Sequence, residues 1–102
     1  MNKEEKKQLL LNLQVPNTEY KHEVFYKALQ EMDDLIGDYS KYFIDMDVDK
    51  ALELTATANY ELCCALLTLT LREDYWSEGS FEERYKAGQI MDIVNRMIEL
   101  LE

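Results

Sequence analysis

The sequence predicts an all-α fold, a small helical bundle of four to six helices packed around a central hydrophobic helix of about residues 48–74. Three observations lead to this prediction. Between residues 62 and 71 the polar side chains are Thr68 and Thr70, so apolar residues cover every face of a helix drawn there, as expected at the centre of a protein. Gly and Pro number 3 and 1, too few for the many turns of an all-β fold. The flanking segments repeat apolar residues at the helical intervals of three and four.

The central stretch could also form a buried strand, because Leu and Thr alternate across residues 66–71. We favour a helix, since residues 48–72 contain no Gly or Pro and are rich in Ala, Leu and Glu. A buried strand would also need partner strands, and the sequence offers none. Asp47 or Asp49 is the expected N-cap of this helix, and the Ser and Gly residues of 77–80 mark its end.

Two amphipathic helices are expected before the central helix. The first covers residues 3–14 and ends before Pro16, because the residue before a proline is biased towards extended backbone. Asn17 or Thr18 caps the second helix, whose apolar stripe runs up to Gly37, a residue suited to the left-handed position after a helix. One or two further helical turns are expected where large apolar residues recur at Tyr39, Tyr42, Phe43 and Met46.

Two shorter helices are expected after the central helix. Ser80 and Glu83 have the spacing of a capping box, in which the serine oxygen accepts from the Glu83 amide and the carboxylate reaches back. Gly88 interrupts the helical pattern, which gives a short helix at 81–87 and a final helix at 89–101. The final helix directs six apolar side chains inwards, namely Ile90, Ile93, Val94, Met97, Leu100 and Leu101.

The length of 102 residues suits a single helical domain spanning 1–102. Lys and Arg number 11 against 21 Asp and Glu, which gives a net charge of -10. A field of that sign repels nucleic acid and anionic membranes, so we expect neither direct nucleic-acid binding nor membrane binding. The first residues combine acids with lysines and contain no long apolar run, so no export signal is expected and the predicted location is cytoplasmic.

The two cysteines, Cys63 and Cys64, are neighbours in the most apolar stretch. Consecutive side chains on a helix point about 100° apart, so a disulfide between them would be strained. We expect them to be small core residues of a cytoplasmic protein. A redox-active pair remains the alternative, and it would require exposure and a lowered pKa.

No motif in the sequence points to catalysis or to a metal. His22 is the one histidine, and no His or Cys stands three or four residues from it. Glu82 and Glu83 resemble half of a magnesium site, but no Glu-x-x-Asp follows them. We therefore expect no catalytic residue, no metal and no cofactor, and the sequence leans against an enzyme.

The most suggestive cluster lies at the end of the central helix, where Arg72, Asp74, Tyr75 and Trp76 occur together. One interpretation is structural: Trp76 packs under the following loop, and Arg72 pairs with Asp74, Glu82 or Glu83. The other is an exposed surface for a protein partner, since Trp, Tyr and Arg dominate such contacts. The candidate interaction residues are Arg72, Asp74, Tyr75, Trp76, Tyr39, Tyr42 and Phe43.

The same cluster carries a resemblance. Residues 71–76, followed by Gly79, a short helix ending at Gly88, and then Ile93 and Arg96, resemble a group of short bacterial proteins catalogued only as a domain of unknown function. The resemblance covers about residues 69–98. It implies a bacterial or phage-encoded helical protein with no assigned activity, and it transfers no site residue.

We therefore expect an uncharacterised small acidic protein that acts as a non-enzymatic protein–protein interaction module and self-associates as a homodimer. The number of apolar stripes motivates this expectation, because a small monomer has difficulty covering them all. A first alternative is an acidic inhibitor or nucleic-acid mimic of phage or mobile-element origin. A second is a small ligand-binding or enzymatic site near Arg72 and Trp76, facing the Tyr39–Phe43 aromatics.

Overall fold

The fold is all-α over the part of the chain that the structure, a computed structural model, describes, which is residues 1–14 and 22–102. Within these ranges there is no strand, and the prediction of a small helical bundle is confirmed. The helices are α1 (Lys3–Leu13), α2 (His22–Glu31), the short 3₁₀ helix η1 (Tyr39–Tyr42), α3 (Val48–Leu52), the 3₁₀ helix η2 (Thr55–Thr57), α4 (Tyr60–Trp76), α5 (Ser80–Lys86) and α6 (Gln89–Leu100).

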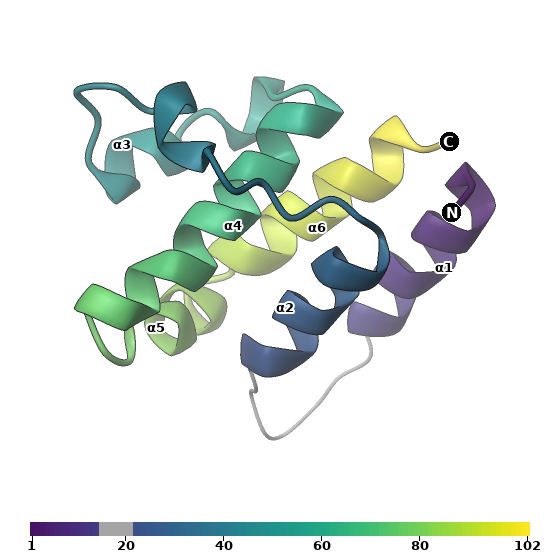
Figure 1. The fold of residues 1–102 in the computed structure, drawn as a ribbon, viewed down its shortest axis with the longest axis horizontal. Coiled ribbons are helices and arrows are strands. Elements are labelled where there is room, and N and C mark those ends of the chain that lie inside the picture. Colours follow the sequence, from purple (N-terminus) through teal and green to yellow (C-terminus); the bar gives the residue numbers. More distant parts are fainter. Residues whose placement is uncertain (15–21) are drawn as a thin grey trace.

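Helix α4 is the centre of the bundle, with α6, α5, α2 and η1 packed around it (Figure 1). Every residue from Cys63 to Leu71 is buried, which explains why this part of the helix has no polar face. Its two threonines satisfy their hydroxyl groups within the helix: Thr68 donates to the Cys64 carbonyl at 2.7 Å and Thr70 to the Leu67 carbonyl at 2.8 Å. Thr68 also accepts from the Ile36 amide at 3.3 Å, so it fixes the chain that crosses α4.

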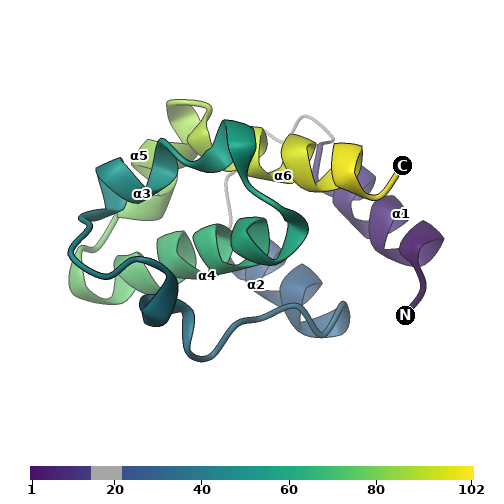
Figure 2. The ribbon, with the colours of Figure 1, turned by 90° about the horizontal axis from the view of Figure 1, so that it is seen from above.

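The prediction of one helix over about residues 48–74 is wrong at its N-terminal side. Asp47 does act as an N-cap, but of the five-residue helix α3, where it accepts from the Lys50 amide at 2.7 Å. A separate helix starts after Asn59, whose side chain accepts from the Leu62 amide at 2.8 Å. Between them Ala58 is extended and buried, and its carbonyl accepts from Nε of Arg96 at 3.0 Å. The chain bends between α3 and α4 (Figure 2), which local helix propensity does not predict. The hydrogen bond from Arg96 on α6 secures this bend.

The end of α2 also differs from the prediction. The helix stops at Glu31, and Asp33 occupies the left-handed position with φ of 58°, a role assigned above to Gly37. The Asp33 amide donates to the Gln30 carbonyl at 3.2 Å and the Asp34 amide to the Leu29 carbonyl at 2.9 Å. These two bonds form a Schellman motif. The predicted caps at Asn17 and Thr18 lie outside the described residues.

Replacing Asp33 with Gly is expected to raise the free energy of unfolding by about 0.5–1 kcal/mol, because glycine adopts a positive φ without the steric cost that a Cβ imposes. Replacing Asp33 with Ala keeps that cost, and alanine tolerates a positive φ less well than aspartate does, so the change lowers stability by a similar amount. Urea unfolding of both variants tests the assignment. Equal stability of the Gly and Ala variants would contradict it.

Two glycines delimit the C-terminal helices, and both have left-handed backbone, with φ of 88° at Gly79 and 86° at Gly88. The predicted interruption at Gly88 is confirmed. The predicted capping box is wrong: α5 begins at Ser80 itself, and the amides of Gly79 and Phe81 donate to Oδ1 of Asp74 at 3.1 and 3.3 Å. A carboxylate from the end of α4 therefore replaces the local serine as the acceptor at this turn.

Candidate interaction surface

Arg72 is held between two tyrosine rings at the C-terminal end of α4. Its guanidinium carbon lies 5.7 Å from the ring centre of Tyr26 on α2 and 5.9 Å from that of Tyr75. Each contact is a cation–π interaction, in which the cation is attracted to the electron-rich ring face. The prediction that Arg72 pairs with Asp74, Glu82 or Glu83 is wrong, since its described partners are aromatic rings.

The two aromatic residues that follow Arg72 are exposed to solvent. Tyr75 is 72% exposed and Trp76 is 61% exposed. The structural interpretation, in which Trp76 packs under the loop before α5, is therefore wrong. Two large aromatic side chains therefore lie exposed at neighbouring positions of the chain. We name Tyr26, Arg72, Tyr75 and Trp76 together the aromatic–arginine surface.

The other predicted interaction residues have different places. Asp74 serves the turn before α5, as described above. Phe43 is 6% exposed and belongs to the core, with the Tyr42 ring 6.2 Å from its own. Loss of solvent and the nearby Glu61 carboxylate raise the pKa of Tyr42. Glu61, which neighbours Tyr42, lies three turns of α4 before Arg72, a distance of about 16 Å along the helix. Tyr42 is therefore not part of the cluster around Arg72. Half-buried Tyr39 begins the same η1 helix.

A buried ion pair between α4 and α5 was not predicted from the sequence. Arg84 on α5 donates through Nε and Nη2 to the two carboxylate oxygens of Glu73 on α4, at 2.7 and 3.0 Å. Its Nη1 donates to Asp49 at 2.8 Å and to Gln89 at 3.2 Å, so one guanidinium ties four helices together. The Glu73 side chain is 9% exposed and that of Arg84 15%. Hydrogen bonding to Glu73 raises the pKa of Arg84, so the arginine stays charged.

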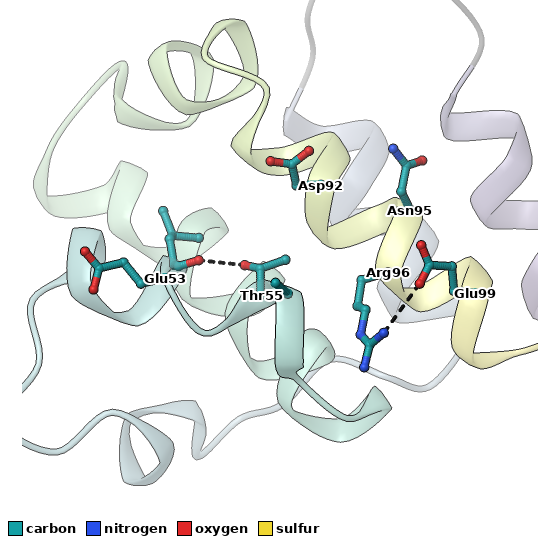
Figure 3. Close-up of a pocket in the computed structure, with 8 residues that line it drawn as sticks. Glu53, Thr55, Asp92, Asn95, Arg96 and Glu99 are labelled. Carbon is teal, nitrogen blue, oxygen red and sulfur yellow. Dashed lines mark hydrogen bonds and ion pairs between the residues drawn. The ribbon is translucent and has the colours of Figure 1, made fainter.

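A hollow of about 530 Å³ lies between the α3–η2 segment and α6. Figure 3 shows Glu53 and Thr55 on one side and Asp92, Arg96 and Glu99 of α6 on the other. Arg96 is already engaged, with Nε on the Ala58 carbonyl and Nη1 3.4 Å from Glu99. Across the described ranges, no group of three or more His, Cys, Asp or Glu residues could hold a metal ion. The hydroxyl of Thr55, which also lines the hollow, donates to the Leu52 carbonyl at 2.8 Å.

Comparison with known proteins assigns the family. A model described as a family of unknown function (DUF6508) matches residues 2–102. This chain belongs to the DUF6508 family. The match extends the resemblance predicted for about residues 69–98 to the N-terminal helices of this DUF6508 chain. No curated protein and no solved structure matches it. Among the described residues, no helix has the length and apolar character needed to cross a membrane.

The cysteines of this DUF6508 chain are core residues, as predicted. Cys63 is fully buried, Cys64 is 2% exposed, and both are free thiols. Burial raises the pKa of Cys63 to about 11, and burial followed by the Asp34 charge raises the pKa of Cys64 further. A raised pKa leaves almost no thiolate near neutral pH, which opposes the alternative of a redox-active pair.

The raised cysteine pKa values predict that the protein loses stability in alkaline solution. An unfolded thiol releases its proton near its ordinary pKa of 9.0, whereas folded Cys63 retains it up to about 11. The stabilisation is therefore complete below pH 9 and is lost as the pH rises towards 11, with Cys63 contributing about 2–3 kcal/mol. Denaturant unfolding on both sides of pH 9 measures the loss. A Cys63→Ala/Cys64→Ala variant is expected to show a smaller loss, and an identical pH profile would contradict this cause.

Proposed function

We propose that this chain is a non-enzymatic protein-interaction module that self-associates, with Tyr75 and Trp76 at the centre of the contact. The observation that carries this proposal is the exposure of these two residues, 72% and 61%, side by side on the last turn of α4. Association would remove both rings from water, and burial of aromatic area is a large source of binding free energy.

The arrangement around these rings suits a binding site. Trp, Tyr and Arg are the residues that most often dominate the binding energy of protein interfaces. Arg72 is already ordered by the rings of Tyr26 and Tyr75, so it loses little side-chain entropy when a partner arrives. Arg72, Tyr75 and Trp76 of this surface also lie on the central helix, whose buried run from Cys63 to Leu71 holds them in a fixed position.

A second copy of the chain is the partner that we propose. A twofold axis brings the same patch of two copies together, and such dimers are the commonest oligomers. The apolar stripes of the helices are mostly covered within one chain. The accessible surface of 6214 Å² is close to the roughly 6000 Å² expected for a folded monomer of this mass. The proposal therefore depends on the aromatic–arginine surface alone.

The predicted cytoplasmic location and the bacterial or phage origin are part of this proposal. Free, buried Cys63 and Cys64 support a reducing, cytoplasmic environment, and the small acidic chain is proposed to be of bacterial or phage origin. A nucleic-acid mimic, the first alternative, would need its acidic side chains to lie together on one face of the protein. Ion pairs with lysine or arginine instead involve acids of several segments, among them Asp34, Asp38, Glu82 and Glu99. No particular observation favours that alternative.

The solution mass tests the proposal. Size exclusion with light scattering, carried out over a wide range of protein concentration, is expected to give twice the monomer mass at the upper end and a shift towards the monomer on dilution. The same measurement on Phe43→Leu, a conservative change in the core away from the surface, serves as the control and should match. A monomeric mass at every concentration would contradict self-association.

A further inference from the structure

A polar hollow of about 390 Å³ lies where α3, α4, α5 and α6 meet, beside the Glu73–Arg84 pair. Asp49, Ser77, Ser80 and Glu83 line it together with that pair. Its volume falls within the range of small-molecule pockets. The hollow is separate from the aromatic–arginine surface, none of whose residues line it.

Ser80 provides the first indication of a ligand. The residue is 9% exposed, and its Oγ is a buried side-chain oxygen without a hydrogen-bond partner among the described residues. Buried polar atoms are almost always hydrogen-bonded, because an unpaired one loses its water without compensation. An unpaired hydroxyl in a residue that lines a polar hollow indicates that something else completes its hydrogen bonding.

The charges around the hollow determine the sign of that ligand. Arg84 supplies the positive charge among the residues that line the hollow. Glu73, Asp49 and Gln89 already accept hydrogen bonds from its guanidinium group. It therefore has little capacity left for an anion. The carboxylates of Glu73, Asp49 and Glu83 outnumber this one cation, so the potential in the hollow is negative and favours a positive ligand.

The donor set distinguishes an organic cation from a metal. A hard metal ion needs several oxygen ligands at close range. In residues 1–14 and 22–102 no cluster of three or more His, Cys, Asp or Glu residues meets that requirement. A primary ammonium group instead carries three N–H donors, which match hydroxyl and carboxylate acceptors. We propose that this hollow binds a primary ammonium group, supplied either by a small free amine or by a lysine side chain of another protein.

Binding can be measured on the full chain by ¹⁵N NMR titration with two probes, ethylammonium and Nα-acetyl-lysine methylamide, at constant ionic strength. We expect saturable shifts of the Ser80 and Glu83 amides with at least one probe. Tighter binding of ethylammonium indicates a free amine, and tighter binding of the lysine derivative indicates a protein side chain. Tetramethylammonium, which has the charge but no N–H donor, is the control. An equal response to it, or no saturable shift with either probe, would overturn the proposal and leave water as the partner of Ser80.

Two variants test the site itself. Ser80→Ala removes the unpaired oxygen and should fold normally, because it removes a polar group that lacks a partner. It should weaken ammonium binding by about tenfold, as should Glu83→Gln. Glu82→Gln is the matched control, since Glu82 pairs with Lys86 and does not line the hollow. Unchanged affinity in Ser80→Ala, with an unchanged circular dichroism spectrum, would show that the hydroxyl is not part of a binding site.

Discussion

Replacing Arg84 with methionine is expected to lower the free energy of unfolding by about 3–5 kcal/mol. The change leaves Glu73, whose side chain is 9% exposed, as a buried carboxylate without its cation. An uncompensated charge in that position either remains at a high desolvation cost or takes up a proton. The contacts with Asp49 and Gln89 are lost at the same time, so α3 and α6 lose a shared attachment to α5.

Denaturant unfolding of three variants distinguishes this cause from a general effect of losing an arginine. Arg72→Met removes the cation–π contacts of a partly exposed side chain and should cost only about 0.5–1 kcal/mol. The double variant Glu73→Leu/Arg84→Met removes both charges and should regain most of the stability that Arg84→Met loses. Equal losses for Arg72→Met and Arg84→Met would contradict a special role for the buried pair.

Replacing Trp76 with alanine is expected to weaken self-association by about 30-fold or more, which corresponds to the 2 kcal/mol or more of an interface hot spot. The free energy of unfolding should change by less than about 0.5 kcal/mol, because Trp76 is 61% exposed in the single chain. Light scattering at a concentration near the dimer midpoint measures the effect. Ile44→Ala is a matched control, since Ile44 is 71% exposed but follows η1 and does not belong to the aromatic–arginine surface.

The salt dependence of the association identifies the kind of partner. Two copies of a chain with a net charge of -10 repel one another, so added salt should strengthen the dimer by screening that repulsion. A basic partner would show the opposite behaviour, because salt screens its attraction to the acidic chain. A dimer that dissociates as salt is raised would mean that ion pairs, rather than the aromatic rings, hold the two copies together.

The sequence by itself determined the features that depend on local pattern. An apolar run without polar faces can only be stable when surrounded, and Cys63 to Leu71 are buried for that reason. The break at Gly88 followed from the freedom of glycine to adopt a positive φ, observed here as 86°. The exposed pair Tyr75 and Trp76 was named from composition, but two opposite interpretations of it remained open. The local pattern of residues indicates how hydrophobic a segment is, but it does not indicate which neighbouring segment covers that segment.

The tertiary structure alone decided the remaining features. The bend before Asn59 depends on a hydrogen bond from Arg96. The left-handed backbone of Asp33 belongs to a turn held in place by its neighbour Asp34. The Asp34 carboxylate accepts from the Lys6 ammonium at 3.0 Å and from the Tyr60 hydroxyl at 2.6 Å. The buried pair joins Glu73 to Arg84 on different helices, so no helical spacing reveals it. In each case the deciding partner is distant in sequence. Hydrophobic periodicity carries no information about such pairings, because they form only when the helices pack.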